Sequence, residues 1–155
     1  MITVEVPTIK DSGERRQFDT GAVRDITDNK GRCDLMPLGV VADLMDDIAL
    51  TYLSEFQEEP ITEHLQGAIL SYCGDVYNGD VESMLLDVSK HFEAGAKKYG
   101  ENNWQKGIPV NCYIDSAVRH YLKFKRGDKD EPHGSAFVWN LMCCAWEVEH
   151  HVKNQ

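Results

Sequence analysis

The stretch from Asp80 to Gly100, DVESMLLDVSKHFEAGAKKYG, carries the clearest helical pattern in the chain. Its apolar side chains recur at steps of three or four residues: Leu85, Val88, Phe92, Ala96 and Tyr99. Such spacing places them on one face of an α-helix. Asp80 is a residue type that caps helix N-termini, and Gly100 is a type that ends helices. We therefore predict a helix between these two residues, with one face packed in a core.

Similar patterns predict helices on both sides of this one: from Leu38 to the residue before Pro60, over Ile61–Tyr77, from Asn111 to Gly127, and from Asp130 onward. The apolar line of the first of these includes Val40, Leu44 and Ile48. Asn111 and Asp130 are the predicted N-caps of the last two. The sequence thus predicts an all-α fold, in which residues 1–155 form a single domain of four to five helices.

The first 37 residues lack such a pattern and indicate an irregular N-terminal arm. Gly13, Gly21 and Gly31 lie among many charged residues, while Met1–Pro7 alternates loosely and is compatible with a short extended segment. A segment of this length without regular secondary structure is uncommon in a compact domain, which favours a role in binding. The alternative is a partly disordered tail.

Composition excludes several classes of protein. The net charge of -10 disfavours binding to a nucleic-acid polymer. No apolar run approaches the roughly 18 residues of a membrane span, and Met1–Lys10 does not resemble a signal peptide. The five cysteines show no paired CxxC spacing, so we expect free thiols in a reducing cytoplasm. We therefore expect a cytoplasmic protein with no membrane partner.

Two predicted helices carry side chains that suit either structure or chemistry. Glu93 and Lys97 are four residues apart and share a helix face. They form either a surface ion pair or a metal-binding carboxylate beside a phosphate-binding amine. Asp115 and Arg119 have the same spacing and suit a supporting salt bridge. His120, on the apolar side of that helix, is either a buried, hydrogen-bonded histidine or a catalytic group.

The stretch Asp130-Glu131-Pro132-His133 places three possible metal ligands at one helix start. Carboxylate oxygens suit Mg²⁺ or Mn²⁺. His133 shares a helix face with Asn140, which is a polar residue on a line that should be core. Asn140 therefore either makes an interhelical hydrogen bond or belongs to the same cleft.

Two cations flank a glycine in the arm, at Lys30 and Arg32 around Gly31. Such a loop is able to close over a polyphosphate, because both side chains donate to phosphate oxygens. Solvated surface charges are an equally good interpretation.

Several blocks of sequence, in this order and spacing, carry a resemblance to a known family: residues 21–25, 30–37, 93–100, 103–104, 106–107, 115–120, 130–133 and 139–140. They resemble the dATP/dGTP diphosphohydrolase N-terminal domain family, which is common in phages and their hosts. That family is similar to the broader all-α nucleotide pyrophosphohydrolases, including MazG-like proteins. Residues 46–83 fall between the blocks, and we interpret them as a helical insertion.

The resemblance implies hydrolysis of purine deoxynucleoside triphosphates to a monophosphate and pyrophosphate, with Mg²⁺ or Mn²⁺ as cofactor. It also implies a homo-oligomer, a dimer or larger. The related helical enzymes bind metal through ExxE and ExxD pairs. Here the residue three after Glu93 is Ala96, and the residue three after Asp130 is His133. Either fewer ions are bound, or some ligands come from elsewhere.

The resemblance and the patterns together assign three sets of site residues. The predicted metal ligands are Glu93, Asp130, Glu131 and His133. The predicted catalytic residues are His120, Glu93 and His133, in which a histidine acts as base. The predicted substrate-binding residues are Lys30, Arg32, Lys97, Lys98 and Arg119 for phosphate charge, Trp104 for stacking on the purine, and Asn103 or Asn140 for its edge.

Two other functions compete with hydrolysis. A non-catalytic nucleotide-binding module would keep Trp104, Lys30 and Arg32 but would need no aligned carboxylates. A phage interaction protein would use the acidic segment between Asp46 and Glu63 as its contact surface, although a solvated helix face explains the same charges.

Overall fold

The computed structural model describes residues 13–26 and 28–152. Six α-helices make up most of this part: α1 (Leu38–Met45), α2 (Ile48–Glu58), α3 (Thr62–Tyr77), α4 (Val81–Tyr99), α5 (Val110–Arg126) and α6 (His133–Glu147). Shorter elements flank them: strands β1 (Arg15–Gln17) and β2 (Val23–Asp25), 3-10 turns η1 (Cys33–Leu35) and η2 (Asn103–Lys106), and a π-helical end, η3 (Val148–Val152). The prediction of a predominantly α fold is confirmed.

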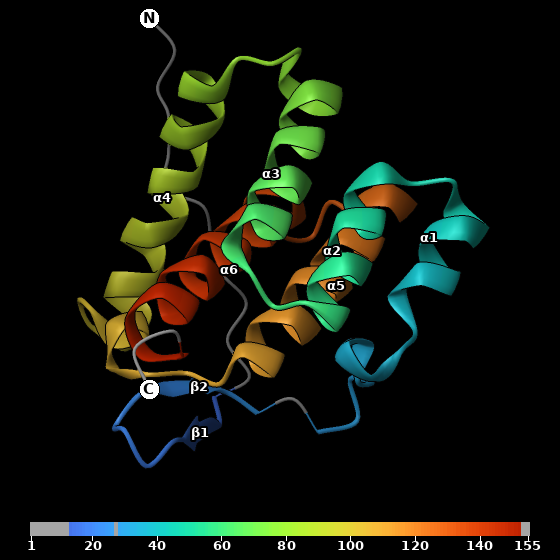
Figure 1. Cartoon of the computed structure of the whole chain (residues 1–155). Coiled ribbons are helices and arrows are strands. Elements are labelled where there is room, and N and C mark those ends of the chain that lie inside the picture. The colour runs from blue at the N-terminus through green and yellow to red at the C-terminus, as the bar shows by residue number, and fades with distance from the viewer. Residues whose placement is uncertain (1–12, 27, 153–155) are drawn as a thin grey trace, which may run out of the picture.

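Helices α5 and α6 lie side by side, and α3 and α4 both pack against α6 (Figure 1). Helix α3 also packs against α2, and α2 packs against α1, so that α1 and α2 form one end of the molecule. The largest buried side chains of this core come from all six helices and include Leu38, Leu50, Leu53, Leu65, Met84, Tyr121, Phe137 and Leu141. The core therefore sits between the α5–α6 pair and the helices that cover it.

The first predicted helix is in fact two, which corrects the expected count of four to five helices to six. Asp46 adopts a left-handed conformation (φ 49°) and ends α1. Asp47 then caps α2, because its Oδ1 accepts a hydrogen bond from the Leu50 N–H at 2.9 Å. With the helix broken here, three side chains that were predicted to face the core are exposed to solvent. The exposed fractions of Val40, Leu44 and Ile48 are 56%, 82% and 67%.

Of the three N-cap residues predicted for α4, α5 and α6, the structure confirms the one at the start of α4. Asp80 caps α4 as expected, with its Oδ1 accepting from the Ser83 N–H at 3.0 Å. The caps predicted at Asn111 and Asp130 are wrong, since α5 and α6 begin after Pro109 and Pro132. Proline suits such starts because its φ is already helical and it lacks the N–H that a helix start leaves unpaired.

The buried face of α4 is also rotated from the predicted one. Leu85 is 40% exposed, whereas Met84, Val88 and His91 are buried. Helix α4 packs mainly on α6 and α3, so its contact face follows those two neighbours and takes in a histidine. The apolar periodicity alone does not select His91.

The arm is more ordered than predicted within its described residues. Strands β1 and β2 form an antiparallel pair in which Arg16 lies opposite Arg24. This hairpin lies along one end of the helices in Figure 1. The extended segment predicted at Met1–Pro7 lies outside the described residues. Residues 46–83 contain α2 and α3, and their origin as an insertion stays a prediction.

All five cysteines are free thiols, and four of them are buried. Burial raises the pKa of Cys143 to about 12, so this thiol stays protonated at neutral pH. Across residues 13–26 and 28–152, none of the helices combines the length and the hydropathy needed to cross a membrane.

Replacing Asp47 by Ala tests the break between α1 and α2. Besides capping α2, Asp47 accepts a hydrogen bond from the buried Tyr121 hydroxyl at 2.5 Å. Losing a cap costs about 1 kcal/mol and an unsatisfied buried hydroxyl costs about 1–3 kcal/mol, so D47A should lower the free energy of unfolding by about 2–4 kcal/mol. Urea denaturation measures this. The exposed neighbour Asp43→Ala serves as control, and an equal effect of both changes would contradict the assignment.

Candidate functional site

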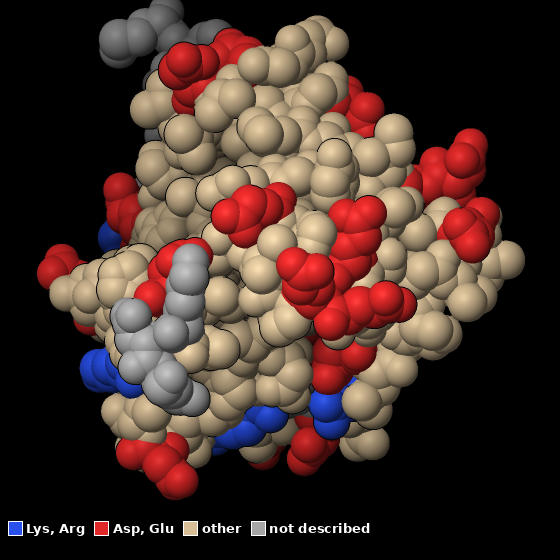
Figure 2. Space-filling model, in the orientation of Figure 1, with Lys and Arg blue, Asp and Glu red and all other residues tan. Residues whose placement is uncertain are grey.

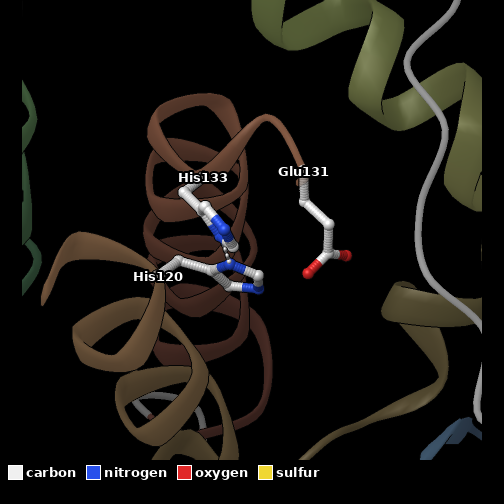
Figure 3. Close-up of side chains that lie close together, drawn as sticks. All are labelled: His120, Glu131 and His133. Atoms are coloured by element: carbon white, nitrogen blue, oxygen red, sulfur yellow. Dashed lines mark hydrogen bonds between the residues drawn. The ribbon is translucent and has the colours of Figure 1, made fainter. Parts of the chain in front are cut away.

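The candidate site lies where the end of α5 meets the start of α6. Gly127 ends α5 in a left-handed conformation (φ 93°), and Pro132 precedes the first residue of α6, His133. The connection between them is short, so the two helix ends stay close. His120, near the end of α5, consequently faces His133 across the connection (Figure 3).

The two imidazoles form one hydrogen-bonded chain with a carboxylate. His120 Nδ1 lies 2.9 Å from His133 Nδ1, and His133 Nε2 lies 2.8 Å from Asp130 Oδ1. An ionised carboxylate only accepts hydrogen bonds, so His133 Nε2 donates to Asp130. With a neutral ring, His133 Nδ1 then accepts a hydrogen bond from His120 Nδ1–H.

His133 lies deepest in the cluster, His120 and Glu131 are half-buried, and Asp130 reaches the surface. The His133 side chain is fully buried, and the Asp130 side chain is 41% exposed. Burial, followed by the neighbouring His133, lowers the pKa of His120 to about 3. His120 is therefore neutral at pH 7, and one of its ring nitrogens carries an available lone pair.

Two overlapping groups of possible metal ligands meet at His133. One nitrogen each of His120 and His133 and one oxygen of Glu131 all lie within 4.8 Å of one another. Asp128, Asp130 and His133 satisfy the same criterion. Figure 3 shows the Glu131 carboxylate turned toward the two rings. We call His120, Asp130, Glu131 and His133 the histidine–carboxylate cluster.

A pocket lies between β2, η2 and helices α4, α5 and α6, with about 520 Å³ of open space including its mouth. Five aromatic side chains line it: Phe92, Tyr99, Trp104, Tyr113 and Trp139. Polar groups in the wall include Arg24, Asn103 and Asn140. Aromatic walls with a few polar groups are typical of small-molecule pockets.

Arg24 lines this pocket and bridges α5 and α6, and it was not predicted as a site residue. Its Nη2 donates to Ser116 Oγ at 3.1 Å and to Asn140 Oδ1 at 3.0 Å. Ser116 precedes His120 by four residues on α5, a rise of about 6 Å. The pocket and the cluster therefore occupy successive turns of the same helix pair. The only sequence hint of Arg24 was its place in the 21–25 block.

His91 is a second residue that the sequence did not indicate. It is 3% exposed, and its ring lies 4.5 Å from that of Trp139, which lines the pocket. Burial, and then the charge of Lys98, lowers the pKa of His91 to about 4. Its Nδ1 has no hydrogen-bond partner within the described part of the chain.

The two asparagines predicted to read the base both bond to the protein. Asn103 holds β2, since its Nδ2 donates to Val23 O at 2.9 Å and its Oδ1 accepts from Val23 N–H at 2.8 Å. Asn140 accepts from Arg24 and donates to Ala136 O. Trp104 is half-buried and meets Phe92 edge to face.

The predicted phosphate-binding residues lie in three different settings. Lys97 and Glu93 form an exposed ion pair at 3.3 Å, and Glu93 belongs to neither group of possible ligands. Lys98 is nearly buried and pairs with Asp25 at 2.8 Å. Arg119 bonds both Asp115 oxygens and also Gly31 O at 2.6 Å.

The Gly31 contact holds the arm loop over α5, one residue before His120. Asp115 strengthens it by accepting from the Cys33 N–H at 2.6 Å. Lys30 and Arg32, on either side of Gly31, are exposed there. Most Lys and Arg side chains visible in Figure 2 lie in the lower part of the view, where the hairpin lies, while acidic side chains are spread over the whole face.

These features define a predominantly α-helical domain in which a histidine–carboxylate cluster lies beside an aromatic pocket. Residues 80–155 match the family model described as dATP/dGTP diphosphohydrolase, N-terminal. The resemblance inferred from the sequence is thereby confirmed for this part of the chain, which contains α4, α5, α6 and the whole cluster. The match does not include the blocks at 21–37. None of the curated proteins or solved structures compared gives a significant match.

Replacing Asn103 by Ala tests its role as the anchor of β2. Without both hydrogen bonds to Val23, the hairpin should open more often, and the amide of Val23 should exchange with solvent at least about tenfold faster. Hydrogen exchange measured by NMR follows this residue by residue. The exposed neighbour Asn102→Gly keeps the positive φ at that site and provides the control. Unchanged exchange in N103A would contradict the anchoring role.

Proposed function

We propose that this chain hydrolyses purine deoxynucleoside triphosphates, dATP and dGTP, to the monophosphate and pyrophosphate with the help of a divalent metal ion. The observation that carries the proposal is the family match over residues 80–155, which include the cluster and most of the pocket wall. The name of the matched family supplies the activity. The aromatic pocket is chemically suited to the base and sugar of such a substrate, and the cluster is suited to its metal-bound phosphates.

The aromatic pocket suits the base and sugar of a nucleotide. Its wall offers flat rings for stacking, at Trp104 and Trp139 among others. Gly95 is also part of this wall, and a Cβ there would lie 3.0 Å from Trp139 Cζ2. The glycine thus keeps space beside the indole.

Arg24 is suited to meet the phosphates between the pocket and the cluster. The hydrogen-bond partners found for its Nη2, Ser116 and Asn140, are uncharged, so they do not neutralise its guanidinium. A fixed positive charge beside the scissile bond stabilises the negative charge that develops there. Lys30, exposed on the loop that Arg119 holds over α5, remains a candidate for the outer phosphates. Arg32 remains one as well, although binding a phosphate competes with its ion pair to Asp34 at 2.7 Å.

The cluster is suited to hold the ion and the attacking water. A bound divalent ion neutralises phosphate oxygens and lowers the pKa of water. Asp130 fixes the orientation of the His133 ring through their hydrogen bond. His120 and His133 remain the candidate bases predicted from the sequence. Glu93 remains a predicted ligand, although its side chain is 53% exposed.

The homo-oligomer and the cytoplasmic location also belong to this proposal. A dimer or larger assembly follows from the resemblance alone. Light scattering at working concentration measures the mass directly, and a strict monomer would remove this part of the proposal.

The activity is tested by assaying pyrophosphate release from all common deoxy- and ribonucleoside triphosphates. We expect release from dATP and dGTP that depends on added metal, and a loss of at least about tenfold in kcat for Glu131→Gln. Glu93→Gln tests the sequence-predicted ligand separately, and normal turnover would remove Glu93 from the site. Nucleotide binding without pyrophosphate release from any substrate would favour the non-catalytic binding module instead.

Replacing Gly95 by Ala tests the pocket. The added methyl group pushes against Trp139, and overpacking of about 1–3 kcal/mol corresponds to a rise in KM of about tenfold with kcat less affected. Gly74→Ala is the matched control, because it also lies within a helix and its Cβ would meet nothing within 4 Å. An unchanged KM in G95A would move the nucleotide away from this pocket.

A further inference from the structure

The histidine–carboxylate cluster differs in donor chemistry from the site that the resemblance implies. Of the three grouped ligand atoms, two are imidazole nitrogens, from His120 and His133, and one is an oxygen of Glu131. Mg²⁺ prefers six oxygen ligands and keeps several of them as water. Imidazole nitrogen suits Zn²⁺, Co²⁺ and other first-row transition ions much better. The donor set therefore does not fit Mg²⁺ as the preferred ion.

The separation of the two imidazoles suits a shared ion. Two nitrogens that each lie about 2.1 Å from one ion are about 3.0 Å apart at a right angle and about 3.4 Å apart in a tetrahedron. His120 Nδ1 and His133 Nδ1 are 2.9 Å apart. In the absence of an ion, the same approach is held by a hydrogen bond between the rings. An ion that binds both nitrogens takes the place of that bond, and the two rings turn so that both lone pairs point at the ion.

Asp130 supplies the outer partner that metal-binding histidines usually have. Its Oδ1 accepts from His133 Nε2 at 2.8 Å, which leaves the lone pair of His133 on Nδ1, facing His120. For His120 to bind through Nδ1 as well, its proton moves from Nδ1 to Nε2.

We propose that His120, His133 and Glu131 bind one first-row transition metal ion, of the class of Zn²⁺ or Co²⁺, in preference to Mg²⁺, with Asp130 orienting His133. This inference concerns the site of the proposed hydrolysis and rests on that proposal for the purpose of the ion. It assigns His120 as a ligand rather than as the base. It also replaces the carboxylate pairs of related enzymes with histidine nitrogens.

The test measures metal binding by tag-free, metal-stripped protein, without any nucleotide. Co²⁺ is titrated in while its visible absorption is followed, because nitrogen ligands intensify and shift the bands of the hydrated ion. Zn²⁺ and Mg²⁺ are then added as competitors. We expect one Co²⁺ per chain, displacement by Zn²⁺, and an affinity for Mg²⁺ at least about 100-fold weaker.

Two variants and two controls locate the ion. His120→Asn and Glu131→Gln should each raise the Kd for Co²⁺ at least about tenfold. Glu131 is only partly buried, so E131Q remains informative if H120N does not fold. His64→Asn removes a histidine that pairs with Glu55 at 3.2 Å elsewhere, and His151→Asn removes one that pairs with Glu147. Both controls should bind Co²⁺ as the wild type does.

Two results would overturn the inference. The first is an affinity for Mg²⁺ equal to that for Zn²⁺ and Co²⁺. The second is unchanged Co²⁺ binding in both H120N and E131Q, or loss of binding in a control instead, which would leave His120 and His133 as a hydrogen-bonded structural pair.

The pyrophosphate assay separates this inference from the proposed function. Cobalt binding at the cluster without hydrolysis of any nucleotide would retain the metal site and reject the enzyme. Hydrolysis supported by Mg²⁺ and unaffected by H120N would retain the enzyme and reject the transition-metal site.

Discussion

The packing of α5 against α6 is the constraint on which the candidate site depends. Tyr121 and Phe137, both buried, fix this contact with ring centroids 4.6 Å apart. One residue before Tyr121 lies His120, and four residues before Phe137 lies His133. The short connection limits how far one helix can slide along the other. Sliding would also separate Tyr121 from Phe137 and expose both rings to water. The same contact that buries apolar area therefore holds the two imidazoles within hydrogen-bonding distance.

The N-terminal arm packs against α5 and α6 and contributes side chains to the pocket wall. Asn103 holds β2 by two backbone hydrogen bonds, and Arg24 on that strand reaches both α5 and α6. Arg119 and Asp115 hold the next part of the arm against α5. An isolated two-stranded hairpin is marginally stable in water, so its order here depends on these contacts. In turn, the hairpin forms one wall of the aromatic pocket.

The chemistry of the cluster follows from where its charges lie. The carboxylates of Asp130 and Glu131 are partly exposed, where hydration lowers the cost of their charge. The His133 imidazole is fully buried and His120 is half-buried, and burial keeps His120 neutral. In the proposed metal site, the imidazole nitrogens and the carboxylate oxygens would together form the ligand set for a cation. Under the proposed function, an acidic protein with a net charge of -10 would also need local cations, such as Arg24, to bind a polyphosphate.

The sequence by itself determined the helical class, the cap at Asp80 and the family resemblance over residues 80–155, because these depend on local spacing and residue type. It also singled out His120 and the 130–133 stretch. Only the tertiary structure decided that these meet, that α1 and α2 separate, and that the buried face of α4 includes His91. Arg24 likewise gained its place only from contacts more than 90 residues away. Such pairings depend on how helices pack, which periodicity within one helix does not encode.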